Sequence, residues 1–218
     1  MKSWSVSRLQ SYESCPAKYD AIYNRGMHGK PGPAAMRGSE IHLKAEHFLS
    51  GSIRGLPTEL KKLAPEYTAL KKAKPMLELK LAVDNAWKPV NWDYSWGRGI
   101  VDALARKGDE MIIIDHKTGR IYQKHIDQAQ VYACLTAANV EDAQEFQTEF
   151  WYTDWGQVRE WHYTRKEVEE ELMPAFEERV MVMHTAKKFP KTPSQSACMW
   201  CPDRTDKGGK CREWRGAK

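Results

Sequence analysis

Apolar residues recur at helical spacing through the first third of the chain. This period predicts helices over residues 5–23, 37–51 and 56–74. Pro16 interrupts the first of these stretches, because proline cannot continue a helix interior. We therefore expect two short helices that meet at Cys15, which places this cysteine at a helix end.

The second and third helical stretches contain their own start and stop signals. Ser39 is the expected N-cap of the second helix, and Gly51 is its expected stop. Pro65 divides the third stretch, which is basic and amphipathic. The first 75 residues are therefore predicted to be mainly helical.

The middle of the chain changes to strand-like patterns. A sheet is expected, with two further helices beside it, and the second helix is interrupted at Pro174. Turns at KGDE and DWGQ join two of the strand pairs into hairpins. The predicted strands are 76–84, 97–106, 111–119, 146–153 and 157–164, and the predicted helices are 125–139 and 164–188. The pattern predicts an α/β fold.

Length and composition favour one domain. The 218 residues, 41% hydrophobic and 29% charged, suit a single globular domain over 1–218 with a helical part (1–75), a sheet-containing core (76–186) and an irregular Cys-rich tail (187–218). The apolar runs are too short for a membrane span, and the N-terminus lacks the apolar middle of a signal peptide. These features predict a cytoplasmic protein with no membrane partner. The net charge of +5 gives mild support for a polyanionic partner.

Two carboxylates and a lysine are expected to meet on neighbouring strands. Asp115 and Lys117 are two residues apart and project to the same face, and Asp102 lies centrally in the preceding strand. Charges beside the apolar run MIII need compensation, which a divalent cation provides. Oxygen ligands favour Mg²⁺ or Mn²⁺, and the lysine would position a water. The alternative is that Asp-x-Lys simply ends a strand at the solvated surface.

Three cysteines lie close together near the end of the chain. Cys198, Cys201 and Cys211 resemble metal ligands, and disulfides are rare in the cytosol. Thiolate sites for zinc or an iron–sulfur cluster usually have four protein ligands. These three residues therefore predict a fourth ligand elsewhere in the chain.

Five short motifs in order resemble the RecB-like branch of the PD-(D/E)XK nuclease superfamily. They are S-x-S-R-L-x-x-Y-x-x-C-P (Ser5 to Pro16), G-x-x-x-H (Gly38 to His42), G-x-x-D (Gly99 to Asp102), D-x-K (Asp115 to Lys117) and Q-x-x-x-Y (Gln128 to Tyr132). Each motif is weak alone, but their order and spacing are specific, and they cover nearly the full length.

The resemblance implies a nuclease core with a central mixed sheet flanked by helices, and it implies a role for each matching residue. His42, Asp102, Asp115 and the backbone carbonyl of His116 would bind Mg²⁺ or Mn²⁺, and Lys117 would be the catalytic lysine. Glu78 matches a less regular acidic position that could hold a water on the cation. Gln128 and Tyr132 would support the site and contact DNA. Each also has a structural alternative: a hydrogen-bonded core histidine, helix packing, or a solvated strand glutamate.

The resemblance also supplies a fourth cysteine. AddB-type recombination nucleases and CRISPR adaptation nucleases hold a [4Fe–4S] cluster with one N-terminal and three C-terminal cysteines, which Cys15, Cys198, Cys201 and Cys211 match. Such a cluster would join the N-terminal helices to the C-terminal tail. The polar insert DRTDKGGK makes the last gap longer than is usual and is expected to be flexible, so a structural Cys₄ zinc site stays open.

The expected function is metal-dependent exonuclease action on DNA ends or single strands, in DNA recombination, repair or phage DNA processing by analogy with the family. A structure-selective endonuclease and a non-catalytic DNA-binding or assembly subunit are the alternatives. The nine tryptophans could stack bases or pack the sheet, and the sequence assigns neither role to any one of them.

Overall fold

The computed structural model describes residues 3–123 and 125–214, and the chain divides into two compact units. The sheet unit contains residues 31–175, and the cysteine unit contains residues 4–30 and the chain from residue 176 onward. Within the described ranges, no helix combines the length and the apolar character that crossing a membrane requires.

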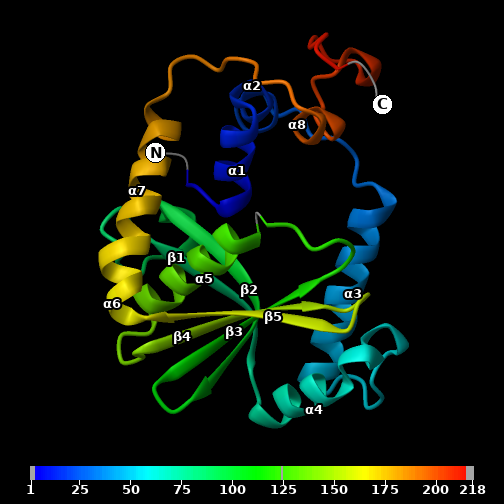
Figure 1. Ribbon diagram of the computed structural model, residues 1–218, viewed down its shortest axis with the longest axis vertical. Coiled ribbons are helices and arrows are strands. Elements are labelled where there is room, and N and C mark those ends of the chain that lie inside the picture. Colours follow the sequence, from blue (N-terminus) through cyan, green and yellow to red (C-terminus); the bar gives the residue numbers. More distant parts are fainter. Residues whose placement is uncertain (1–2, 124, 215–218) are drawn as a thin grey trace. The chain divides into compact units, whose positions relative to one another are not determined.

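The sheet unit is built on five strands in the order β1-β2-β3-β4-β5 (Figure 1). Its elements are α3 (Pro33–Ser50), η2 (Thr58–Leu63), α4 (Ala64–Ala73), β1 (Met76–Val83), η3 (Trp92–Tyr94), β2 (Gly97–Lys107), β3 (Glu110–Lys117), α5 (His125–Asn139), β4 (Glu145–Tyr152), β5 (Gln157–Thr164), α6 (Arg165–Glu167) and η4 (Val168–Leu172). β3 and β4 are parallel, and the other neighbours are antiparallel. The predicted α/β fold with a mixed sheet is confirmed.

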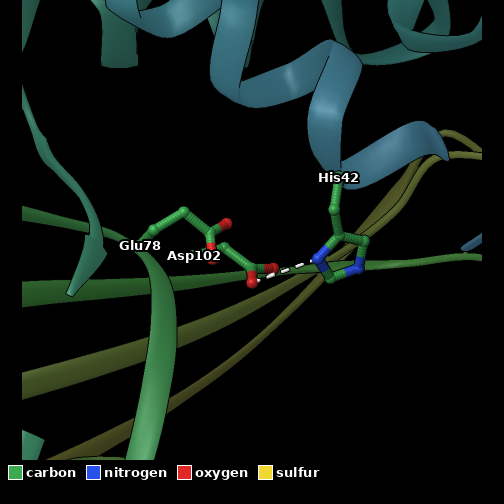
Figure 2. Close-up of side chains that lie close together, drawn as sticks. All are labelled: His42, Glu78 and Asp102. Atoms are coloured by element: carbon green, nitrogen blue, oxygen red, sulfur yellow. Dashed lines mark hydrogen bonds and ion pairs between the residues drawn. The ribbon is translucent and has the colours of Figure 1, made fainter. Parts of the chain in front are cut away.

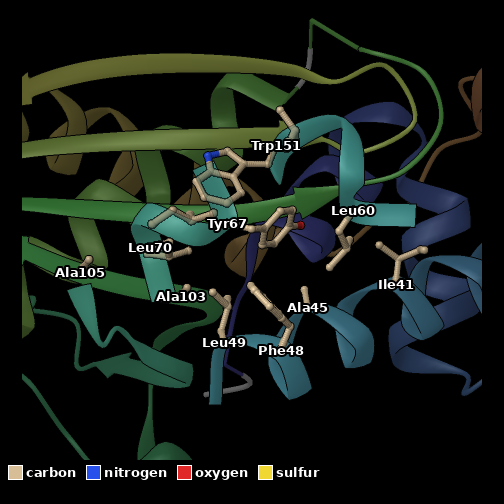
Figure 3. Close-up of a cluster of buried hydrophobic side chains, with 12 residues drawn as sticks. Ile41, Ala45, Phe48, Leu49, Leu60, Tyr67, Leu70, Ala103, Ala105 and Trp151 are labelled. Atoms are coloured by element: carbon tan, nitrogen blue, oxygen red, sulfur yellow. The ribbon is translucent and has the colours of Figure 1, made fainter. Parts of the chain in front are cut away.

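A hydrophobic cluster joins α3, η2 and α4 to one face of the sheet (Figure 3). The rings of Tyr67 and Trp151 meet edge to face with centroids 4.9 Å apart, and Phe48 contacts Tyr67 from α3. Ala103 and Ile114 supply the β2 and β3 surface beneath these rings. This packing fixes α3, which carries His42, against the strands that carry Asp102 and Asp115.

Helix α5 lies on the opposite face of β4 from Trp151. Thr148, whose side chain alternates with that of Trp151, donates a hydrogen bond of 3.2 Å to the carbonyl of Ala129 in α5. At Gly99 a Cβ atom would lie 2.9 Å from the side chain of Leu135, so glycine permits the close approach of α5 to β2. The glycine of the G-x-x-D motif thus has a packing role.

The cysteine unit is mainly helical. Its elements are α1 (Val6–Ser14), α2 (Pro16–Tyr19), η1 (Asp20–Asn24), most of α7 (Met173–Thr185), α8 (Gln195–Met199) and η5 (Thr205–Lys207). Trp4 stacks on Phe176, and Tyr19 contacts Phe189, so both ends of the chain contribute to this core. The predicted break between two helices at Cys15 is confirmed. The tail predicted as irregular contains the short elements α8 and η5.

Two predicted helix boundaries are wrong. α3 begins at Pro33 rather than after Ser39, because proline at the first helical position needs no N–H partner and has a helical φ. Ser39 instead donates to the carbonyl of Ala35 within the helix. Helical structure also continues through Pro174, and the irregularity precedes it as a π-helical turn at Val168–Leu172, where the ladder adjusts to the missing N–H.

Candidate active site

The two candidate aspartates lie where β2 and β3 separate. The last paired residues of this ladder are Ala103 and Ile114, so Asp102 and Asp115 are the next opposing positions. Their exposed fractions are 8% and 2%. Two nearly buried carboxylates side by side require strong compensation from hydrogen bonds or cations.

Asp102 receives two hydrogen bonds. Its Oδ2 accepts the backbone N–H of His116 at 2.6 Å, and its Oδ1 lies 3.1 Å from Nδ1 of His42 (Figure 2). The backbone of His116 also lies close enough to His42 to raise the pKa of its imidazole. The N–H of His116 points to Asp102, and the carbonyl of the same strand residue points to the same edge of β3. The His42 ring, the Asp102 carboxylate and the His116 carbonyl therefore converge.

The charge of Asp102 controls the protonation of His42. Burial lowers the pKa of His42, but the hydrogen bond and attraction to Asp102 outweigh it and raise the pKa to about 9. Without a cation, the pair is therefore a protonated imidazole beside a carboxylate at neutral pH. A cation at this position would replace the positive charge of the imidazolium.

Glu78 completes a compact group of possible metal ligands. Within residues 3–123 and 125–214, one group of three ligand atoms lies within 4.8 Å of one another, contributed by His42, Glu78 and Asp102 (Figure 2). Although Glu78 is exposed, desolvation by its neighbours and the nearby Asp102 carboxylate raise the pKa of Glu78. The side chains come from α3, β1 and β2, so the fold and not local sequence brings them together.

The backbone at Glu78 is strained. Its φ is +48°, a left-handed conformation that is rare for a residue with a Cβ atom. The β1–β2 register is continuous at Leu77 and Leu79 but omits Glu78, which lies opposite Asp102. Strain of this kind concentrates at functional positions. It provides an observation in favour of Glu78 that the sequence did not contain.

Asp115 is held by a separate hydrogen-bond network. Lys117 Nζ lies 2.6 Å from Asp115 Oδ2 and donates to Gln128 Oε1 at 2.8 Å. Gln128 donates to Asp115 Oδ1 at 2.9 Å, and the Tyr132 hydroxyl lies 3.3 Å from the same oxygen. Burial and nearby Asp115 raise the pKa of Tyr132, which keeps its hydroxyl neutral. The residues of the D-x-K and Q-x-x-x-Y motifs are thus in direct contact.

The geometry is compatible with a divalent cation. Oδ2 of Asp115 is buried and is paired with the ammonium of Lys117 at 2.6 Å. The donors are carboxylates and one imidazole, which suit Mg²⁺ or Mn²⁺. His42 and Glu78 also line a groove of about 500 Å³, a volume typical of ligand sites. Asp115 lies outside the compact group of His42, Glu78 and Asp102.

The sequence did not predict an aromatic cluster that lies next to the site. The ring of His116 is buried, its Nδ1 lies 3.1 Å from the hydroxyl of Tyr67, and Trp151 packs beside both rings. Burial lowers the pKa of His116 to about 4, so its imidazole is neutral. Helical periodicity marks Tyr67 only as a core residue, so no sequence signal could have paired it with His116.

The turn between β4 and β5 is connected to two elements of the site. Asp154 accepts a hydrogen bond of 3.0 Å from Nη1 of Arg37 in α3 and one of 2.8 Å from the backbone N–H of Gly119. Thr153 donates its backbone N–H to the carbonyl of Lys117 at 3.0 Å. This turn therefore holds the segment that follows the lysine against the helix that carries His42. Sequence patterns gave no indication of these contacts.

All four candidate cysteines line one pocket within the cysteine unit. Cys15 lies between α1 and α2, Cys198 lies on α8, and Cys201 and Cys211 follow it. Burial raises the pKa of the Cys201 thiol. No three of these sulfurs form a group as compact as the 4.8 Å set at the carboxylates, within the part of the chain that the structure describes.

The insert between Cys201 and Cys211 is folded, although the sequence suggested flexibility. Asp203 accepts Arg25 Nη2 at 2.9 Å and the backbone N–H of Lys210 at 3.1 Å. At Gly209 a Cβ atom would lie 2.2 Å from the backbone of Asp203, so the turn requires glycine. A bridge between Arg204 and Cys211 completes the reversal. The long gap thus returns Cys211 to the other cysteines.

Comparison with known proteins supplies the classification. The family model of the PD-(D/E)XK nuclease superfamily matches residues 3–205. The chain belongs to this superfamily. As a PD-(D/E)XK protein it is a nuclease by family. Asp102 lies on β2, and Asp115 and Lys117 lie on β3.

Solved structures share the fold at low identity. The crystal structure of SSO0001 has 17% identity and a TM-score of 0.52, covering 91% of this chain and 82% of that chain. A structure described as "Putative exonuclease" from Eubacterium rectale has 11% identity and a TM-score of 0.54, covering 90% and 87%. No curated protein matches the sequence. These likenesses show a shared fold.

Proposed function

We propose that the protein is a divalent-metal-dependent deoxyribonuclease of the RecB-like branch that acts as an exonuclease on DNA ends or single strands. The observation that carries the proposal is the meeting of His42, Glu78 and Asp102 within 4.8 Å beside the Asp115–Lys117 pair. Phosphodiester hydrolysis needs charge stabilisation at phosphorus and a positioned water, and these groups are suited to both tasks.

The proposed cation ligands are three side chains and one backbone carbonyl: His42, Asp102, Asp115 and the carbonyl of His116. Glu78 is proposed as a further ligand. When bound, Mg²⁺ or Mn²⁺ supplies Lewis-acid stabilisation of the charge on the phosphate. The N–H of His116 and the ring of His42 fix the Asp102 carboxylate before binding. Such prior positioning reduces the reorganisation needed during the reaction.

Lys117 is proposed to orient the attacking water. Its side chain is 17% exposed, and its ammonium lies between the Asp115 carboxylate and the Gln128 amide oxygen. Gln128 and Tyr132 act as positioning residues, since they hold Asp115 and restrict the lysine to one orientation. A Gln128→Ala variant should therefore lower kcat more than it weakens DNA binding.

The choice between end-dependent and internal cleavage has a direct test. Linear end-labelled DNA and circular single-stranded DNA are incubated with pure protein and Mg²⁺ or Mn²⁺. Degradation of the linear strand alone supports the exonuclease, and cutting of the circle favours the structure-selective endonuclease. The prediction of nuclease activity is falsified if neither substrate is degraded, which would favour the non-catalytic DNA-binding subunit.

We propose further that Cys15, Cys198, Cys201 and Cys211 hold a [4Fe–4S] cluster. Four thiols around one pocket form a suitable donor set. A structural Zn²⁺ ion bound by the same four thiolates is the alternative.

Anaerobic purification followed by metal analysis and a visible spectrum tests the cluster separately from the nuclease. Four irons and a brown chromophore that disappear in Cys15→Ser are expected. The matched control is Cys134→Ser, because Cys134 is a buried cysteine of α5 outside the pocket. One zinc without iron would contradict the cluster and leave the nuclease proposal intact.

A further inference from the structure

An exposed tryptophan lies next to the candidate active site. Trp155 follows Asp154 in the turn between β4 and β5, and 58% of its surface is exposed. Its indole Nε1 donates a hydrogen bond of 2.6 Å to the carbonyl of Gly119, two residues after Lys117. The ring is therefore fixed at one edge while a large apolar surface remains in contact with solvent.

Basic side chains accompany this ring. Arg37 pairs with Asp154 while 49% of its side chain stays exposed, and Lys62 donates to the Asp154 backbone carbonyl at 2.6 Å. Arg120, the residue after Gly119, is exposed as well. Glu40 and Glu59 also lie near Arg37, but both pair with Lys44, so the basic side chains around Trp155 still favour a polyanion.

The surface continues into the groove that contains the proposed cation ligands. Gly38, next to Arg37, lines the groove with His42 and Glu78. A Cβ atom on Gly38 would lie 3.5 Å from the hydroxyl of Thr118, so the start of α3 and the segment after Lys117 are in contact. A chain bound at Trp155 can therefore extend toward the carboxylates.

We propose that Trp155, with Arg37, Lys62 and Arg120, binds single-stranded DNA by stacking one unpaired base on the indole. Aromatic stacking beside a basic groove is the general means of binding single strands, because every base has a π face. A base pair in the interior of a duplex does not offer this face, because its neighbours cover both sides. The inference rests on the proposed nuclease function and names the unpaired strand as its preferred substrate.

The test compares Trp155→Ala, Trp155→Phe and Tyr94→Ala with the wild type. Anisotropy of a labelled single-stranded oligonucleotide in EDTA reports binding without catalysis, and steady-state hydrolysis with Mn²⁺ reports KM and kcat. Loss of one stacked base should weaken single-strand binding by about 10-fold in Trp155→Ala. The loss of affinity should appear as a higher KM, and binding of a closed circular duplex, which has no exposed terminal base pair, should be unaffected.

Trp155→Phe separates stacking from scaffolding. Phenylalanine retains an aromatic face but loses the hydrogen bond to Gly119, so stacking predicts near-wild-type binding. Tyr94 is the matched control, because it is an aromatic residue of the same unit with 84% exposure in η3. Its alanine variant should bind like the wild type.

The proposal is overturned if Trp155→Ala binds the single strand like the wild type, or if Trp155→Phe loses as much affinity as Trp155→Ala. It is also overturned if duplex binding falls equally. Wild-type protein with an abasic oligonucleotide provides a test that needs no variant: removal of the bases should reproduce the loss in Trp155→Ala. Failure of hydrolysis alone refutes the nuclease function, whereas unchanged anisotropy refutes the stacking surface.

Discussion

Glu78 permits a quantitative test because its backbone strain and its carboxylate can be separated. Glu78→Ala removes the carboxylate but keeps a Cβ atom at a φ of +48°, so the backbone strain remains. Glu78→Gly removes the carboxylate and the strain. A left-handed residue with a Cβ atom costs roughly 1–2 kcal/mol, and glycine loses about 0.5–1 kcal/mol more conformational entropy on folding. The free energy of unfolding of the glycine variant should therefore be about 1 kcal/mol higher than that of the alanine variant.

Urea unfolding in EDTA measures this difference, which corresponds to roughly fivefold in the equilibrium constant. Lys74 is the control, because it also has a left-handed φ, +53°, but lies at the C-cap of α4. The free energy of unfolding of Lys74→Gly should exceed that of Lys74→Ala by a similar amount. If the Lys74 pair shows the difference and the Glu78 pair does not, the strain at Glu78 is refuted.

Repeating the unfolding with Mn²⁺ tests the carboxylate. A ligand that binds only the folded protein stabilises it, so Mn²⁺ should raise the unfolding free energy of the wild type and both Lys74 variants. Mn²⁺ should raise the unfolding free energy of both Glu78 variants by less. Equal stabilisation of Glu78→Ala and the wild type would contradict a role for Glu78 in binding the cation.

Three further outcomes are expected. The pKa of His42 is raised to about 9 in the folded protein. In EDTA its ion pair with Asp102 should therefore stabilise the fold fully below pH 6.5, and this contribution should be lost as the pH rises through 9. Urea unfolding should show a wild-type advantage over His42→Gln at pH 6 that shrinks by about 1–2 kcal/mol at pH 9.5, after allowance for screening; an unchanged advantage would refute the coupling. Lys117→Met should lower kcat by roughly 100-fold or more while Mn²⁺ binding, measured by calorimetry, persists. Gly99→Val should lower the unfolding free energy by about 1–3 kcal/mol, because its side chain would collide with Leu135 in α5; wild-type stability would contradict this close packing.

Local patterns predicted most elements of the fold. The hairpin β2–β3, the helix α5 and the hairpin β4–β5 follow from alternation, helical period and turn residues, which act over a few positions. Ser39 was predicted wrongly as a cap because Pro33 begins the helix earlier. Pattern analysis ranks competing start signals poorly when both are present.

The candidate site was predictable only as far as its motifs. Asp115 and Lys117 share a strand, so their ion pair follows from residue spacing. Glu78 is different, because its strain and its approach to Asp102 depend on the β1–β2 register, which no local pattern specifies. The contacts of Asp154 with Arg37 and Gly119 likewise join segments far apart in sequence.

The folded insert between Cys201 and Cys211 shows the same limit. Its polar composition suggested flexibility, yet Asp203 organises it through Arg25 and the backbone of Lys210. One of these partners is local, whereas the other lies near the opposite end of the chain. Composition does not reveal such long-range contacts.

Metal-dependent hydrolysis of end-labelled linear DNA tests the central claim most directly. The wild type should degrade it with Mg²⁺ or Mn²⁺ and not in EDTA, and Asp102→Asn should abolish the reaction. Asp142→Asn should retain it, because Asp142 pairs with Arg106 on the surface. Hydrolysis by Asp102→Asn at the wild-type rate, or no hydrolysis by the wild type with either metal, would contradict the proposed site.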